Sequence, residues 1–223
     1  FIDGVVVNGH LGELYLESHG VVFSPETARI NEFSVKNTDV SLTLENMEDT
    51  DTTTTEPIYW KILLDEIDFE NVGFALNMPQ DSLFVRTMLP KTTLKDGVID
   101  LKEASYYVKS FDMDNAELAY GPKEELSLKK IGLQLDSIYY CGRDIRANIE
   151  EFVFKERSGL ELVSTEGRIA SDSVLIQIPK FTMKTTASSL DLQTKIGWDV
   201  LEMKKTGVLS AKINAEIGKG DVA

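Results

Sequence analysis

Three ten-residue segments decide the fold predicted from this sequence: FSVKNTDVSL (residues 33–42), IDFENVGFAL (67–76) and FDMDNAELAY (111–120). Each segment has apolar side chains at its first, third, eighth and tenth positions and an asparagine at its fifth. Apolar residues two apart lie on one face of a β-strand, and asparagine tolerates the left-handed backbone found in tight turns. We therefore predict that each segment is a β-hairpin. The turns would lie at Asn37, Asn71 and Asn115.

Looser copies of this pattern follow along the chain. A fourth copy begins at Ile131 without the asparagine, and two more begin at Phe152 and Phe181 with the second arm displaced by one or two residues. The copies start between 20 residues (111 to 131) and 44 residues (67 to 111) apart, which does not fit a strict solenoid. The sequence instead predicts an all-β chain, a long antiparallel meander of hairpins over residues 1–223.

Three windows depart from simple alternation. Residues 58–66 and 143–152 also have apolar residues at helical spacing, so a short helix in either window stays open. We prefer strands because each window leads directly into a copy of the repeat. The acidic, threonine-rich stretch EDTDTTTTEP (48–57) has no apolar residue, and we predict that it is a solvated loop within a hairpin connection.

Composition argues against several classes of protein. The 223 residues include 23 Lys and Arg against 37 Asp and Glu, a formal net charge of −14, which disfavours binding to nucleic acid or to an anionic membrane surface. A single cysteine, Cys141, excludes a disulfide framework. No apolar run reaches the ~18 residues of a membrane-spanning helix. Because the first residue is Phe1 and not methionine, we expect the chain to be a piece of a longer protein.

Catalytic and metal-binding motifs are missing from the sequence. Only two histidines are present, His10 and His19, and their spacing matches no zinc motif. Phosphate-binding glycine loops and the GxSxG nucleophile motif are absent. Adjacent carboxylates such as Glu150 and Glu151 would face opposite sides of a strand. We therefore predict a protein that is not an enzyme, with no catalytic residue, metal or cofactor.

Several phrases in the second half of the chain resemble the AsmA-like family of Gram-negative envelope proteins, and within it the TamB-like translocation and assembly modules. These phrases occupy residues 133–162, 166–192 and 211–222. In the first third, residues 4–18 look like a similar strand–turn–strand unit. The resemblance implies an elongated, curved antiparallel sheet that forms an open trough with an apolar inner surface.

The same resemblance implies a function and a location. Members of the family are thought to span the periplasm from an inner-membrane anchor and to carry phospholipids toward the outer membrane. They are also implicated in outer-membrane protein assembly with a partner barrel protein, which would be engaged by parts of the chain not present here.

Apolar positions of the repeat would line the trough and contact phospholipid acyl chains, because each methylene removed from water contributes ~0.8 kcal/mol. The predicted lipid-binding residues are Phe33, Val35, Leu42, Ile67, Phe69, Phe74, Phe111, Met113, Leu118, Ile131, Leu133, Ile138, Phe152, Phe154, Phe181 and Met183.

Two further expectations follow from the sheet. A section of an open sheet has unpaired edge strands, so the chain should tend to associate with itself through its first and last strands. The alternative architecture is a secreted or surface β-sandwich that binds carbohydrate or protein through loops such as 48–57.

Overall fold

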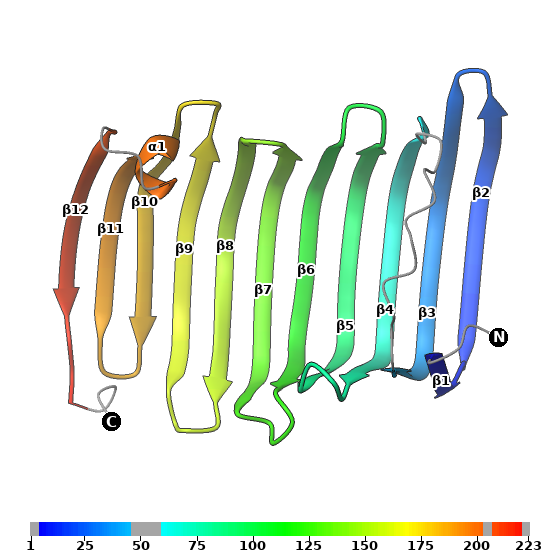
Figure 1. Cartoon of the computed structure of the whole chain (residues 1–223), viewed down its shortest axis with the longest axis horizontal. Coiled ribbons are helices and arrows are strands. Elements are labelled where there is room, and N and C mark those ends of the chain that lie inside the picture. The colour runs from blue at the N-terminus through cyan, green and yellow to red at the C-terminus, as the bar shows by residue number, and fades with distance from the viewer. Residues whose placement is uncertain (1–4, 46–58, 203–206, 220–223) are drawn as a thin grey trace.

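The computed structural model describes residues 5–45, 59–202 and 207–219, and within them the chain forms twelve strands and one short helix (Figure 1). The strands are β1 (Val5–His10), β2 (Glu13–Phe23), β3 (Glu26–Leu44), β4 (Lys61–Met78), β5 (Leu83–Asp100), β6 (Ser105–Tyr120), β7 (Leu126–Cys141), β8 (Asp144–Glu156), β9 (Glu161–Ser171), β10 (Leu175–Thr185), β11 (Ser189–Gly197) and β12 (Leu209–Glu216), and the helix is α1 (Trp198–Leu201).

All twelve strands belong to one open sheet, in the order β1-β3-β4 and then consecutively to β12, with β2 also beside β3. The predicted all-β, elongated open sheet is therefore confirmed. Its accessible surface is 15113 Å², against about 10,000 Å² for a compact monomer of this mass. The described residues contain no second sheet, so the β-sandwich alternative is wrong.

One pair of neighbouring strands breaks the meander. Strands β3 and β4 are parallel and in register, with Phe33 beside Ile67, whereas every other pair of neighbouring strands in the described residues is antiparallel. Parallel neighbours need a crossover and not a hairpin. The stretch 48–57 belongs to this crossover, so its predicted place in a hairpin connection is wrong; its own residues lie outside the described part.

Strands β1 and β2 together form one edge of the sheet. Val5 faces Leu44 and Glu13 faces Lys36, so both strands follow β3 in a single antiparallel register. The predicted strand–turn–strand unit at 4–18 is therefore wrong, because the chain continues in one direction past Gly12. A Cβ on Gly12 would lie 2.5 Å from two carbonyl oxygens of β3, which explains why a glycine occupies this position.

The three asparagines of the repeat adopt the left-handed backbone, but they do not reverse the chain. Asn37, Asn71 and Asn115 have φ of 51°, 53° and 54°, and each lies inside a continuous strand, β3, β4 or β6. A type I′ hairpin turn needs two successive residues with positive φ, and here only one is present. The predicted hairpins at these three segments are therefore bends within long strands. The looser copies from Phe152 and Phe181 do contain turns, at residues 157–160 and 186–188.

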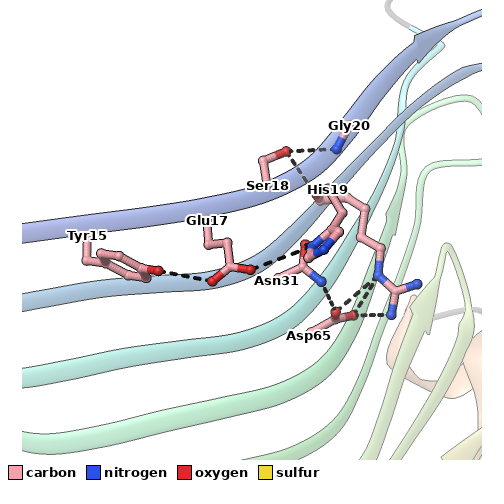
Figure 2. Close-up of polar contacts among 8 residues, drawn as sticks. Tyr15, Glu17, Ser18, His19, Gly20, Asn31 and Asp65 are labelled. Carbon is pink, nitrogen blue, oxygen red and sulfur yellow. Dashed lines mark hydrogen bonds and ion pairs between the residues drawn. The ribbon is translucent and has the colours of Figure 1, made fainter.

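These bends line up across neighbouring strands in two rows. In the first row, Ile30 faces Leu64 and Glu32 faces Glu66. Asn31 and Asp65 lie between these pairs, one in each strand, and interrupt the regular pairing. Extra residues in a strand bend it and increase its twist, and Figure 2 shows the ribbons turning at this point. The first bend row comprises Asn31, Asp65, Asp96, Lys109 and Ser137, and the second comprises Asn37, Asn71, Pro90 and Asn115.

The two windows with an open helical alternative are strands where they are described. β4 begins at Lys61 and β8 begins at Asp144, so the preference for strands is confirmed. The short helix α1 follows β11 instead, at the end of the sheet that is uppermost in Figure 1. We call this end the upper rim, and it carries the turns at 101–104, 142–143 and 172–174.

Candidate functional site

One face of the sheet carries an unbroken row of apolar positions that crosses it from β2 to β12. Strand pairing places each member directly beside the next. At the one glycine of the row, Gly167, a Cβ would lie 2.6 Å from the ring of Phe181, so that ring occupies the space. The central row is Leu16, Phe33, Ile67, Leu94, Phe111, Leu135, Ile149, Gly167, Phe181, Leu192 and Ile213.

A second row lies two residues along the strands, on the same face. The rings of Phe33 and Phe69, one from each row, meet edge to face with centroids 6.3 Å apart. Thr92 is its one polar member, and its hydroxyl is buried without a hydrogen-bond partner. The second row is Leu14, Val35, Phe69, Thr92, Met113, Leu133 and Phe152.

The apolar face continues past the bend rows. A Cβ on Gly97 would touch both Leu64 and Leu94, which lie on either side of the first bend row, so these side chains share a face. The two residues between Gly97 and Leu94 point to the other side. Lys95 pairs with Glu66 at 3.0 Å, and Asp96 accepts a hydrogen bond from Lys109 at 3.0 Å. Each bend of the first bend row therefore adds a polar residue to the polar face and keeps the apolar face continuous.

All sixteen residues predicted to bind lipid lie on this apolar face. The first two rows hold nine of them: Phe33, Ile67, Phe111, Phe181, Val35, Phe69, Met113, Leu133 and Phe152. The other seven follow by strand pairing and alternation: Ile138 beside Val108, Leu42 beside Leu76, Phe74 beside Thr87, Leu118 beside Thr87, Ile131 beside Ala116, Phe154 beside Leu162, and Met183 beside Leu190. Their shared face is a structural fact, and their contact with lipid stays a prediction.

Sequence reasoning missed several members of the central row because they do not occupy the four apolar positions of the repeat. Leu94, Leu135 and Ile149 fill the gaps between predicted residues. Period-2 alternation around each of them was the signal that could have identified them.

Exposure along the apolar face depends on the number of neighbouring strands. Val35 on β3 and Ile131 on β7, which both have a neighbouring strand on each side, are 8% and 6% exposed. Leu16 on β2 and Ile213 on β12, at the two ends of the central row, are 58% and 63% exposed. Nothing among the described residues covers this face.

The opposite face is polar and held by hydrogen bonds and ion pairs. At the first bend row, Asn31 donates to Asp65 at 2.8 Å (Figure 2). Arg29 donates to the same carboxylate at 3.0 Å. The hydrogen bond to Asp65, followed by its charge, raises the pKa of the Arg29 guanidinium. His19 lies 2.5 Å from the Asn31 side-chain oxygen, so this histidine belongs to a bridge between β2 and β3.

The described residues show no cluster of three or more His, Cys, Asp or Glu side chains suited to a metal. Hollows on the molecule lie mainly over the polar face; one of about 520 Å³ is lined by Lys129, Lys155 and Arg157 together with Glu117 and Glu156. In the described part of the chain, no helix is long and apolar enough to cross a membrane.

Comparisons with known proteins give no identity. No protein-family model matches the chain, and neither the curated proteins nor the solved structures yield a significant match.

Proposed function

We propose that this chain is a periplasmic section of an AsmA-like, TamB-like envelope protein and acts as a non-catalytic conduit for phospholipid. Acyl chains would lie on the apolar face and move along the central row, across the strands, between the inner and outer membranes. The proposal includes an inner-membrane anchor and an outer-membrane barrel partner engaged by other parts of the full-length protein.

The observation that carries the proposal is the continuity of the central row. Its eleven positions run from one edge strand to the other, and no charged side chain interrupts them. An acyl chain on such a surface can pass from strand to strand while it keeps its apolar contacts, which are worth ~0.8 kcal/mol per methylene. An ordinary protein core would be covered on this side by a second layer.

The polar face supports the same proposal from the other side. Ion pairs such as Lys36 with Glu70 and Lys95 with Glu66 cross neighbouring strands and stay in water. A single sheet can thus be hydrated on one face and offer an apolar surface on the other. Transport along such a surface needs no catalytic group.

Lipid uptake by the purified chain tests this function. The chain is incubated with vesicles of phosphatidylethanolamine and phosphatidylglycerol and re-isolated, and the bound phospholipid is counted by mass spectrometry. We expect bound lipid for the unmodified chain. Leu133→Asp should remove most of it, because the carboxylate must stay hydrated and interrupts the second row.

Gln134→Asp is the matched control, since Gln134 is the next residue of β7 and is exposed on the polar face. It should retain lipid. Circular dichroism should show similar strand content for both variants, because the carboxylate of Leu133→Asp can turn to solvent on an uncovered face. Equal lipid uptake by both variants, or none by the unmodified chain, would contradict the proposal.

A further inference from the structure

Strands β6 and β7 carry two pairs of facing tyrosines next to the upper rim. Tyr106 faces Tyr140, and Tyr107 faces Tyr139. Because successive side chains of a strand alternate, the two pairs point to opposite faces. Tyr106 also faces Ile99, and Tyr140 faces Ile145, so this pair belongs to the apolar face.

One member of the pair on the polar face, Tyr139, has a structural role. The guanidinium of Arg146 lies 4.7 Å from the centre of the Tyr139 ring, a cation–π arrangement. Arg146 also donates two hydrogen bonds to Asp144, at 3.0 and 2.8 Å. Contacts within the chain therefore explain why Tyr139 is aromatic.

The pair on the apolar face has no such explanation. Tyr106 and Tyr140 are 42% and 46% exposed, with ring centroids 6.0 Å apart. Within the described part of the chain, neither hydroxyl makes a hydrogen bond. Two hydroxyls thus project from an otherwise apolar surface without a partner.

Their position is the boundary between apolar surface and water. Tyr106 is the second residue of β6 and Tyr140 is the last but one of β7, so the turns at 101–104 and 142–143 lie just beyond them. Toward the middle of the sheet, the next residues on this face are Val108 and Ile138, which face each other. Tyrosine suits such a boundary, because its ring packs on apolar groups while its hydroxyl reaches polar ones.

We propose that Tyr106 and Tyr140 bind the polar end of the amphiphile carried on the apolar face. Their hydroxyls donate hydrogen bonds to an ester or phosphate oxygen of a glycerophospholipid at the upper rim, and the acyl chains extend from there toward the central row. This inference rests on the proposed function and adds to it the orientation of the lipid. At the opposite end of β6, the single Tyr120 lies between Val85 and Leu126 and forms no such pair.

Paired hydroxyl deletions test the inference. Tyr106→Phe/Tyr140→Phe removes two oxygens and keeps both rings, and Tyr107→Phe/Tyr139→Phe makes the same change on the polar face. The probes are dioctanoyl phosphatidylglycerol, titrated by calorimetry, and pyrene, a hydrocarbon without polar atoms, followed by fluorescence. Circular dichroism and urea unfolding check that each variant folds.

We expect the apolar-face variant to bind the phospholipid roughly 5- to 150-fold more weakly, as the loss of two hydrogen bonds predicts. Its affinity for pyrene should stay within about twofold, because the apolar surface that burial depends on is unchanged. The polar-face variant should bind both probes as the unmodified chain does. A dioctyl ether analogue, which lacks the ester carbonyls, identifies the acceptor: a persistent difference assigns the phosphate, and a lost difference assigns the ester.

Unchanged phospholipid affinity in Tyr106→Phe/Tyr140→Phe, with pyrene still bound, would overturn this inference and leave the proposed function standing. An equal loss of affinity for both probes would also overturn it, since it would report damage to the apolar surface. If the unmodified chain bound neither probe, the proposed function itself would fail, and the inference with it.

Discussion

Leu14 and Val35 face each other across β2 and β3, in the same row of the apolar face, yet Leu14 is 57% exposed and Val35 is 8% exposed. Val35 has a strand on each side, whereas Leu14 has a strand on one side only. In a single-layer sheet, burial therefore comes from lateral neighbours and not from a covering layer. Strands with a neighbour on each side therefore bury apolar side chains, and the edge strands leave them open.

Truncation of a central side chain should have the largest effect on folding. Ile131→Ala removes a side chain that is 6% exposed, and we expect a loss of ~2–4 kcal/mol in the free energy of unfolding. Leu14→Ala at the edge should lose less than ~1 kcal/mol, because most of that side chain is already in water. Urea unfolding followed by circular dichroism measures both. Similar losses at the two sites would contradict the conclusion that neighbouring strands are what buries these side chains.

Substitution of a bend residue in a strand with neighbours on both sides should have the next largest effect on the free energy of unfolding. Asn71 has φ of 53°, and Asn71→Val places a β-branched residue in the left-handed region at a cost of ~1–3 kcal/mol. Asn71→Gly is the matched control, since glycine adopts this backbone freely. It should stay within ~1 kcal/mol of the unmodified chain, because it loses only the exposed hydrogen bond to Asn37. If valine were tolerated as well as glycine, β4 would not need this bend.

Self-association tests whether the unpaired sides of the edge strands bind another copy of the chain. Every residue of β2 and of β12 is exposed, and each strand pairs on one side only. Sedimentation velocity should therefore show dimers or larger species that increase with concentration. Ile213→Lys should reduce them, because it places a charge among the apolar side chains of the edge. A chain that stays monomeric at high concentration would contradict this prediction.

A lower pH should have the smallest effect on the stability of the fold. Hydrogen bonds from Arg146 lower the pKa of Asp144, and the backbone N–H groups of Leu175 and Val174 lower that of Asp172. Hydrogen bonds that the side chain and the backbone N–H of Ser158 donate to the carboxylate of Glu156 lower the pKa of that group likewise. The unfolded chain then binds more protons than the folded one, so stability should fall as the pH drops below their ordinary values of 3.8 for Asp and 4.5 for Glu.

The shift in the urea midpoint between pH 6 and pH 3 measures this effect, which should be small because all three carboxyls are in water. Asp172→Asn should reduce the shift while its oxygen still accepts the two backbone hydrogen bonds. A midpoint that rises toward pH 3 would contradict the sign.

Alternation along single segments was enough to predict β-strand conformation and the apolar face, but not where each strand ends. The pattern around Phe33 and Val35 is local, and strand geometry converts it directly into a shared face. Asn37 misled the prediction because its left-handed backbone is compatible with a hairpin turn and with a bend, and the choice depends on the residue after it. The parallel pairing of Phe33 with Ile67 depends on contacts between segments far apart in sequence, which no local pattern specifies.

Photo-crosslinking from adjacent residues of β7 tests the central claim most directly. A photoreactive amino acid is placed at Leu133, at Gln134 or at Phe69 of β4 in the chain produced in cells, and attached phospholipid is detected after irradiation. The account predicts phospholipid adducts from Leu133 and Phe69 and none from Gln134. An absence of adducts at Leu133 and Phe69, in cells where a known lipid carrier forms them readily, would contradict the claim that this face carries lipid.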